Sequence, residues 1–232
     1  MLQGFYFSEP EIITGKRIDP SKLSLLKLLL LIAKESEASE IEKELQFQPG
    51  LSYNLLRMVN SAGSGIPQNI NSINRAIMIL GRKQLHRWAQ LLLYTATQKD
   101  GSKSDALMQT AAIRGKLLEF IAKADRPHDK SHQDRAFTVG ILSLLDTLLG
   151  IEMSQIVETL SIQQDMRLAL IERKGILGKQ LELIEANEKG EIRKVIPMLA
   201  DQGFLEMSEL TSMELEAYVW ASRISDSVNE SN

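Results

Sequence analysis

The residues of this sequence that could hold a metal ion are its three histidines, His86, His128 and His132. His128 directly precedes Asp129, and such a pair can ligate a divalent cation when further side chains converge on it. His128 and His132 also have the i, i+4 spacing of one helix face. Polar neighbours, Lys130 among them, favour an exposed loop, whereas a metal site needs rigid support. We therefore expect His128 and Asp129 to lie in a solvated loop. The alternative is a metal site in a metal-dependent phosphohydrolase, formed by the three histidines and Asp129.

Nucleophilic and phosphate-binding motifs are the next candidates for chemistry. The chain has no cysteine, which excludes thiolate catalysis, thiolate metal sites and disulfides. It also has no Gly-x-Ser-x-Gly nucleophile motif. Residues 60–65 contain glycines but lack the lysine and spacing of a phosphate-binding loop, so a helix end followed by a turn explains them better. The sequence therefore predicts no catalytic residue, no metal ligand and no cofactor.

A local cluster of positive charge is formed by Arg75, Arg82, Lys83, His86 and Arg87, with no acidic residue among them. Lys83 and Arg87 are four residues apart and share one face of the predicted helix. Three interpretations are open: a solvated face, a contact surface for a domain or protein partner, and a nucleic-acid surface presented by a helix-turn-helix-like unit. The net charge of −3 argues against nucleic acid.

Length and composition are those of an ordinary globular protein. The 232 residues allow one large domain or two small ones, with 44% hydrophobic and 25% charged residues. The longest apolar run, residues 28–33, is too short to span a bilayer. The first residues lack the basic and apolar regions of a signal peptide. We expect no membrane association and, because cysteine is absent, a cytoplasmic location.

Nearly every segment after residue 18 has the apolar spacing of a helix, and no segment after residue 20 alternates with a period of two. We therefore predict an all-α fold, a compact bundle of about ten helices over residues 19–224. Gly81 is expected to end one helix before another follows. Residues 1–18, which are rich in aromatics before Pro10, are predicted to form an extended arm, and the polar residues 225–232 a disordered tail.

One predicted helix, which ends near residue 124, carries a cation on an apolar face. Arg114 lies among small and apolar residues, and a buried arginine requires a partner. Asp146, on another apolar helix, is the expected partner in a structural ion pair. Gly115 and several alanines of the same helix predict a close approach to a neighbouring helix.

Residues 49–94 carry a family resemblance. The motif residues are Pro49, Leu51, Ser52, Leu55, Leu56, Arg57, Asn60, Ser61, Ala62, Ile73, Ala76, Ile77, Leu80 and Gly81. In this spacing they resemble the HDOD domain, a helical module of bacterial signalling proteins that is related to HD phosphohydrolases. Gln48 departs from the family pattern, in which an Asp usually precedes the proline. The resemblance implies a contact surface at Pro49, Leu56, Asn60, Ser61, Gly81, Arg82, Lys83 and Arg87.

The resemblance continues into residues 137–150, which look like the helix that carries the His-Asp metal pair in HD enzymes. By that matching, Ser143 and Leu144 occupy the positions of the pair. Leucine cannot ligate a metal, and serine is a poor ligand for a hard cation. The resemblance therefore implies degenerate HD positions and a chain that is not an enzyme. His128 and Asp129 lie about fifteen residues too early to replace the pair.

Residues 1–18 are similar to the end of an EAL domain, the cyclic di-GMP phosphodiesterase fold. Residues 82–88 and 217–221 look like the HDOD branch that follows such domains. The catalytic carboxylates of an EAL domain lie on earlier strands, which are not part of this sequence. The resemblance implies a non-catalytic regulatory module linked to cyclic di-GMP signalling that acts through protein–protein or interdomain contacts. A protein partner or an adjacent signalling domain is expected, and a homodimer is an alternative.

Overall fold

The computed structural model describes residues 27, 28, 30, 31, 36–46, 52, 55, 56, 59, 70, 72–95, 101–160 and 162–229. All regular structure within these residues is α-helical, which confirms the predicted all-α class. The helices are α2 (Ala38–Gln46), α4 (Ile73–Thr95), α5 (Gly101–Asp125), α6 (Lys130–Leu142), α7 (Leu145–Leu149), α8 (Met153–Leu160), α9 (Gln164–Glu172), α10 (Gly175–Glu188), α11 (Ile192–Gln202) and α12 (Met207–Asn229). The predicted arm of residues 1–18 lies outside the described residues.

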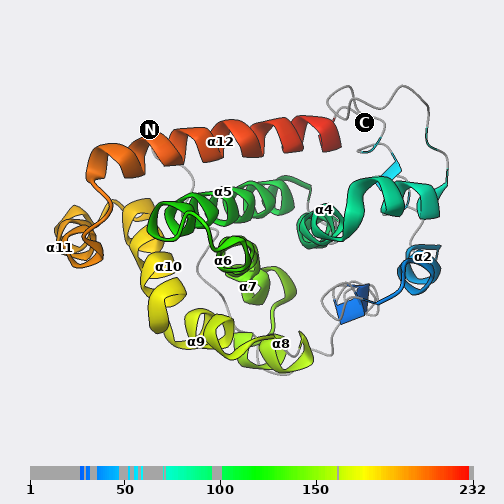
Figure 1. Ribbon diagram of the computed structural model, residues 1–232, viewed down its shortest axis with the longest axis horizontal. Coiled ribbons are helices and arrows are strands. Elements are labelled where there is room, and N and C mark those ends of the chain that lie inside the picture. Colours follow the sequence, from blue (N-terminus) through cyan, green and yellow to red (C-terminus); the bar gives the residue numbers. More distant parts are fainter. Residues whose placement is uncertain are drawn as a thin grey trace.

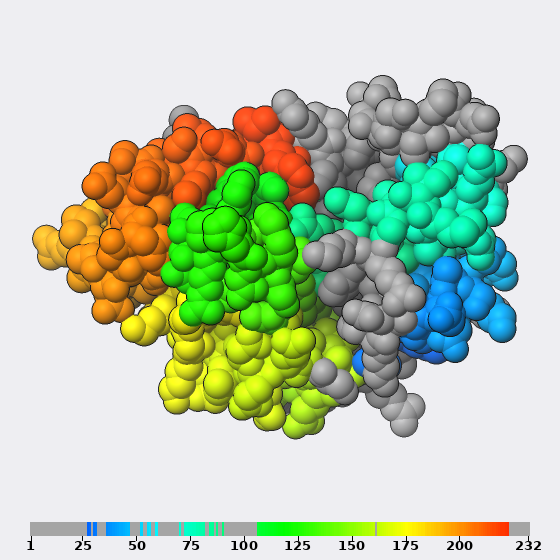
Figure 2. All heavy atoms as spheres, in the orientation of Figure 1, coloured from blue at the N-terminus to red at the C-terminus, as the bar shows by residue number. Residues whose placement is uncertain are grey.

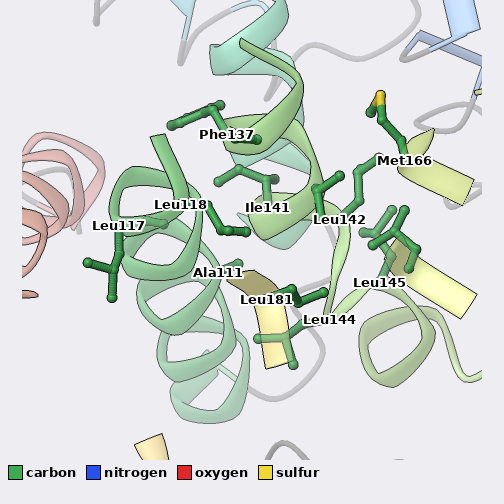
Figure 3. Close-up of a cluster of buried hydrophobic side chains, with 14 of the residues drawn as sticks. Ala111, Leu117, Leu118, Phe137, Ile141, Leu142, Leu144, Leu145, Met166 and Leu181 are labelled. Atoms are coloured by element: carbon green, nitrogen blue, oxygen red, sulfur yellow. The ribbon is translucent and has the colours of Figure 1, made fainter. Parts of the chain in front are cut away.

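Helices α5 and α6 lie at the centre of the molecule. In Figure 1, α12 runs along one side of α5, and α8, α9 and α10 lie on the other side. Helices α4 and α2 form the end of the molecule that is opposite to α11. Figure 3 shows a cluster of buried side chains to which α5, α6 and α7 contribute, with Leu118, Ile141 and Leu145 among them. Burial of each such side chain stabilises the fold by about 1.5–3 kcal/mol. The centre of the bundle is therefore a single apolar core.

Two glycines set how closely α5 and α6 approach. A Cβ atom at Gly140 would lie 2.6 Å from the backbone of Arg114, and one at Gly115 would lie 2.8 Å from the Ile141 side chain. Real Cβ atoms do not come so near to backbone atoms, so only glycine fits at position 140 in this packing. The close helix approach that was predicted from Gly115 of α5 is confirmed. Gly140 is the glycine on the α6 side of the same contact.

Helix α4 is bent at Gly81. The backbone there has φ 69° and ψ 164°, so two helical segments meet at a kink. These angles belong to a region that is essentially restricted to glycine. The prediction that one helix ends at Gly81 before another follows is confirmed.

Helix α12 packs on α5 and is longer than predicted. Its inner face buries Leu210, Ala217 and Ala221, while the Glu209 carboxylate accepts a hydrogen bond from the Glu206 backbone N–H at 2.9 Å, at the start of the helix. The helix continues to Asn229, whereas a disordered tail was predicted from residue 225. Residues 225–228 contain neither glycine nor proline, so nothing in them stops the helix. Among the described helices, none is both long enough and apolar enough to cross a membrane.

Candidate functional site

Ser143 and Leu144, the positions matched to the HD metal pair, lie at the junction between α6 and α7. The Ser143 hydroxyl donates a hydrogen bond to the Gly140 carbonyl oxygen at 2.7 Å and accepts one from Arg114 Nη1 at 3.1 Å. Leu144 is 2% exposed and packs in the core next to Leu145. Both positions therefore have structural contacts, one polar and one apolar.

Arg114 is the centre of a buried polar network. Its Nε and Nη2 atoms donate to the two carboxylate oxygens of Glu188 at 2.6–3.0 Å, and its Nη1 lies 3.5 Å from Glu185 Oε1. Only 5% of the Arg114 side chain is exposed, and only 9% of that of Glu188. Because bidentate pairing satisfies both the charge and the donors, an arginine can be buried in this way. We expected Asp146 to be the partner of Arg114; the carboxylates found there are those of Glu188 and Glu185.

Glu185 extends the network to the end of α9. Its carboxylate accepts hydrogen bonds from Arg173 Nε at 2.9 Å and from Arg173 Nη2 at 2.8 Å. Arg173 also caps α9 in the left-handed conformation, with φ 54°. Asp146 lies nearby in α7, where burial raises the pKa of its carboxyl although hydrogen bonds from Thr147 act in the opposite direction. The network thus ties α5, the α6–α7 junction, α9 and α10 together.

The charge of this network bears on metal chemistry. A cation bound at the Ser143 hydroxyl would lie within a few ångströms of the Arg114 guanidinium, which is always protonated. Like charges at such a separation repel by several kcal/mol at the effective dielectric of a partly buried site. The carboxylates of Glu185 and Glu188 are already engaged with arginines. The arrangement is suited to holding helices together and poorly suited to binding a divalent ion.

Asp129 is the N-cap of α6. Its Oδ1 accepts a hydrogen bond from the His132 backbone N–H at 2.8 Å, and this bond is the main reason that the pKa of the Asp129 carboxyl is lowered. His128 precedes it in an exposed turn. The exposed turn agrees with the predicted solvated loop at His128, and the role of Asp129 is to begin a helix.

His132 lies in the first turn of α6, and its burial corrects a prediction. The sequence suggested an exposed surface here, but only 3% of the residue is exposed, because α6 begins at Lys130 and position 132 faces inward. The Nε2 atom has no hydrogen-bond partner and lies 4.0 Å from Asp125 Oδ2. Burial lowers the pKa of the imidazole. Within the described side chains, which do not include His86, no three histidines or carboxylates are placed to hold a metal ion.

Arg87, a member of the predicted basic surface, is held by contacts within the chain. Its Nη2 atom donates to Glu119 and, at 3.0 Å, to Asp134 Oδ1. The guanidinium also lies 4.5 Å from the centre of the Phe137 ring, a cation–π distance. The side chain is 22% exposed. Its charge is thus largely compensated inside the domain.

Aromatic contacts extend this arrangement to α12. The rings of Phe137 and Trp220 are 5.8 Å apart in an edge-to-face arrangement, and Lys116 Nζ lies 5.5 Å from the Trp220 ring. Lys116 also pairs with Glu119 at 2.8 Å. The cluster joins α4, α5, α6 and α12. Sequence reasoning missed it, although Lys116 and Glu119 have the i, i+3 spacing of a helix pair.

The other predicted contact residues are only partly described. Leu56 is partly buried and packs against the core, and Gly81 forms the α4 kink. Arg75, at the start of α4, is exposed, and its backbone N–H is 3.4 Å from Ser72 Oγ. Those that lie outside the described residues or side chains are Pro49, Asn60, Ser61, Arg82, Lys83 and His86. The contact surface as a whole stays a prediction.

Comparison with known proteins gives matches over most of the chain. The sequence model of the HDOD domain matches residues 23–174. A Vibrio cholerae protein named cyclic di-GMP phosphodiesterase CdgJ is 31% identical over 223 residues, which are 96% of this chain and 50% of that protein. Bacillus subtilis YuxH, an uncharacterized protein, is 31% identical over 229 residues, 97% of this chain and 54% of that one. The chain thus spans about half the length of the curated relatives it matches.

A solved structure shows the same fold at lower sequence similarity. A putative phosphohydrolase from Shewanella amazonensis matches with a TM-score of 0.57 at 15% identity, covering 94% of this chain and 96% of that one. The family match ends at residue 174, just before α10, whereas both relatives match nearly the whole chain. Together with the helical architecture, the match over residues 23–174 shows that the chain belongs to the HDOD domain family.

Proposed function

We propose that this chain is a non-catalytic regulatory module of cyclic di-GMP signalling and that it acts through protein–protein or interdomain contacts. The relative from Vibrio cholerae carries the name of a cyclic di-GMP phosphodiesterase and is twice as long as the region it shares with this chain. On this proposal the phosphodiesterase activity resides in the other half of such proteins, an EAL domain by our sequence interpretation. The HDOD half transmits or receives the regulatory state.

The observation that carries the non-catalytic part is the contact between Arg114 and Ser143. An enzyme of the HD type needs metal ligands at the positions matched to Ser143 and Leu144. Here the first is bonded to a guanidinium at 3.1 Å and the second is buried among apolar side chains. A fixed positive charge at this place opposes a bound cation and supplies no general base.

Measurements of hydrolysis and of metal content test the proposal that the chain is non-catalytic. The purified chain is incubated with cyclic di-GMP, and separately with bis(p-nitrophenyl) phosphate, in the presence of Mn²⁺ or Mg²⁺, and its metal content is measured by mass spectrometry. We expect no turnover above that of a heat-inactivated sample and no stoichiometric transition metal. Metal-dependent turnover that falls on substitution of Asp129→Ala or His132→Ala would establish the phosphohydrolase alternative instead.

The proposed regulatory role predicts that the module changes the activity of another domain or of a partner protein. Contacts between domains can shift an equilibrium only if they differ between the states of the partner. The aromatic and ionic cluster of Arg87, Phe137 and Trp220 supports this proposal, because it links α4 to α12 across the bundle and could couple their positions.

A further inference from the structure

The outer face of α12 exposes apolar side chains. Leu215, Tyr218 and Val219 are 50–64% exposed, while Leu210 and Ala217 of the same helix are buried against the bundle. The spacing i, i+3, i+4 places the three exposed side chains side by side on the helix surface. Contiguous apolar side chains on a helix surface mark a contact site more often than single ones do.

Acidic residues accompany this face. Within α12, residues 207–222 contain three carboxylates and no Lys, Arg or His, and Arg223 is the first cation of the helix. Glu216 is exposed, stands three residues before Val219, and makes no ion pair with any described residue. Glu209 stands one heptad earlier on the same side of the helix. We call Leu215, Glu216, Tyr218 and Val219 the α12 surface; it is apolar with a negative edge.

Helix α11 presents the opposite charge. Ile192 and Ile196 are 49% and 59% exposed and are one helical turn apart. Arg193 is exposed, stands three residues before Ile196, and has no ion pair among the described residues. Lys189 and Lys194 are exposed nearby, and of these Lys194 pairs with Glu191 at 2.7 Å. We call Ile192, Arg193 and Ile196 the α11 surface; it is apolar with a positive edge.

We propose that the α12 surface of one copy of this chain binds the α11 surface of a second copy. Each surface combines exposed apolar side chains with a charge three residues before one of them, and the two charges are opposite. Figure 1 shows α11 beyond α10 at one end of the molecule and α12 along its side, and Figure 2 shows both helices at the outside of that end. Both surfaces are exposed in one copy, and a second copy offers each of them an apolar surface with a charge of the opposite sign.

The contact is heterologous, because two different surfaces meet in it. Such a contact leaves one free surface of each kind on a dimer, so association continues with concentration unless the copies close into a ring. Few apolar side chains take part, which makes the contact a weak one. Its charges lie at the edge of the contact and are accessible to salt, so association weakens as the ionic strength rises.

Sedimentation velocity of the purified full chain tests the proposal. We expect the weight-average sedimentation coefficient to rise with protein concentration between roughly 10 μM and roughly 1 mM, the range in which a weak contact is populated. Leu215→Glu or Ile196→Glu should abolish this rise. Met78→Glu is the matched control: it replaces another exposed apolar side chain, on α4, and should leave the rise unchanged.

Charge exchange identifies the two partners of the contact. Glu216→Lys and Arg193→Glu should each weaken self-association by about threefold or more, because each brings like charges together. An equal mixture of the two variants should associate again, because the lysine introduced in one variant faces the glutamate introduced in the other. Circular dichroism of each variant checks that it is folded. A chain that sediments as a monomer at all concentrations, variants that associate like the parent, or a mixture that does not recover would overturn the proposal.

Discussion

Arg114 is the centre of a buried polar network, and its removal would leave the buried carboxylate of Glu188 without this partner. The substitution Arg114→Met should lower the free energy of unfolding by about 3–5 kcal/mol, since Glu188 would remain buried and unpaired. Urea denaturation measures this loss. The matched control is Arg135→Met, whose partner Asp165 has a side chain that is 47% exposed and whose loss should cost at most about 1 kcal/mol. Equal effects of the two substitutions would contradict the buried network.

His132 should make stability depend on pH. Burial lowers the pKa of its imidazole below the ordinary 6.5, so the folded state favours the neutral form. Asp125 opposes this shift, while Arg126 and Arg135 reinforce it. Between the unfolded and folded pKa values the unfolded chain binds more protons, so stability is lost as the pH falls below about 6.5. At higher pH the imidazole is neutral in both the folded and the unfolded state, so His132 adds no pH dependence there.

The measurement compares His132→Leu with the parent chain. Urea midpoints are recorded from about pH 7 to about pH 5, the range in which histidine titrates. The parent should lose stability relative to the variant as the pH falls, because leucine has no proton to gain. Parallel curves for the two proteins would show that His132 does not carry the pH dependence.

At the residue scale, the sequence indicated the burial of Arg114 but not the side chains with which the charged residues pair. The apolar neighbours of Arg114 predicted that it needs a counter-ion, but Glu188 is 74 residues away, and local spacing does not encode that contact. Arg87 looked like part of a basic face because Glu119 and Asp134 come from later helices. His132 looked exposed because its neighbours are polar, and only the start of α6 decides which way it points.

Helices α5 and α6 approach closely at their crossing, and Gly140 should be sensitive to a single methyl group. Gly140→Ala should destabilise the protein by about 1–3 kcal/mol or more, because a Cβ atom would lie 2.6 Å from backbone that cannot move without separating the helices. Gly115→Ala is the comparison, since the nearest obstacle there is the flexible end of Ile141. Thermal unfolding should rank Gly140→Ala as the more damaging change, and the reverse order would refute this packing.

At the element scale, helical periodicity predicted the all-α class, and Gly81 predicted the break between the two segments of α4. Gly150, where φ is 67°, also ends a helix in a conformation that glycine adopts more readily than other residues. The predicted end of α12 is wrong because polar residues do not by themselves stop a helix, and residues 225–228 contain no glycine or proline. Arg173 ends α9 with φ 54°, although it is not a glycine, and its side chain bonds to Glu185, twelve residues later; local spacing predicts neither feature.

The stability of the whole molecule depends on helices that follow the region matched by the family, residues 23–174. Residues after 174 supply Glu185 and Glu188 to the Arg114 network and Trp220 to the aromatic cluster. A chain that ends at residue 174 should therefore lose cooperative unfolding, because the buried Arg114 and the α5 surface under α12 would be exposed. Circular dichroism during heating tests this. A truncated chain that unfolds with the midpoint of the full chain would show that α10–α12 form an independent addition.

For the whole molecule, we propose that the module regulates phosphodiesterase chemistry carried by another part of a signalling protein. The most direct measurement is the rate of cyclic di-GMP hydrolysis by the Vibrio cholerae relative in three forms: intact, with the matched half deleted, and with that half replaced by this chain. We expect deletion to change kcat and replacement to restore it at least partly, while the isolated chain hydrolyses nothing. Equal rates in all three forms, or hydrolysis by the isolated chain, would contradict the account.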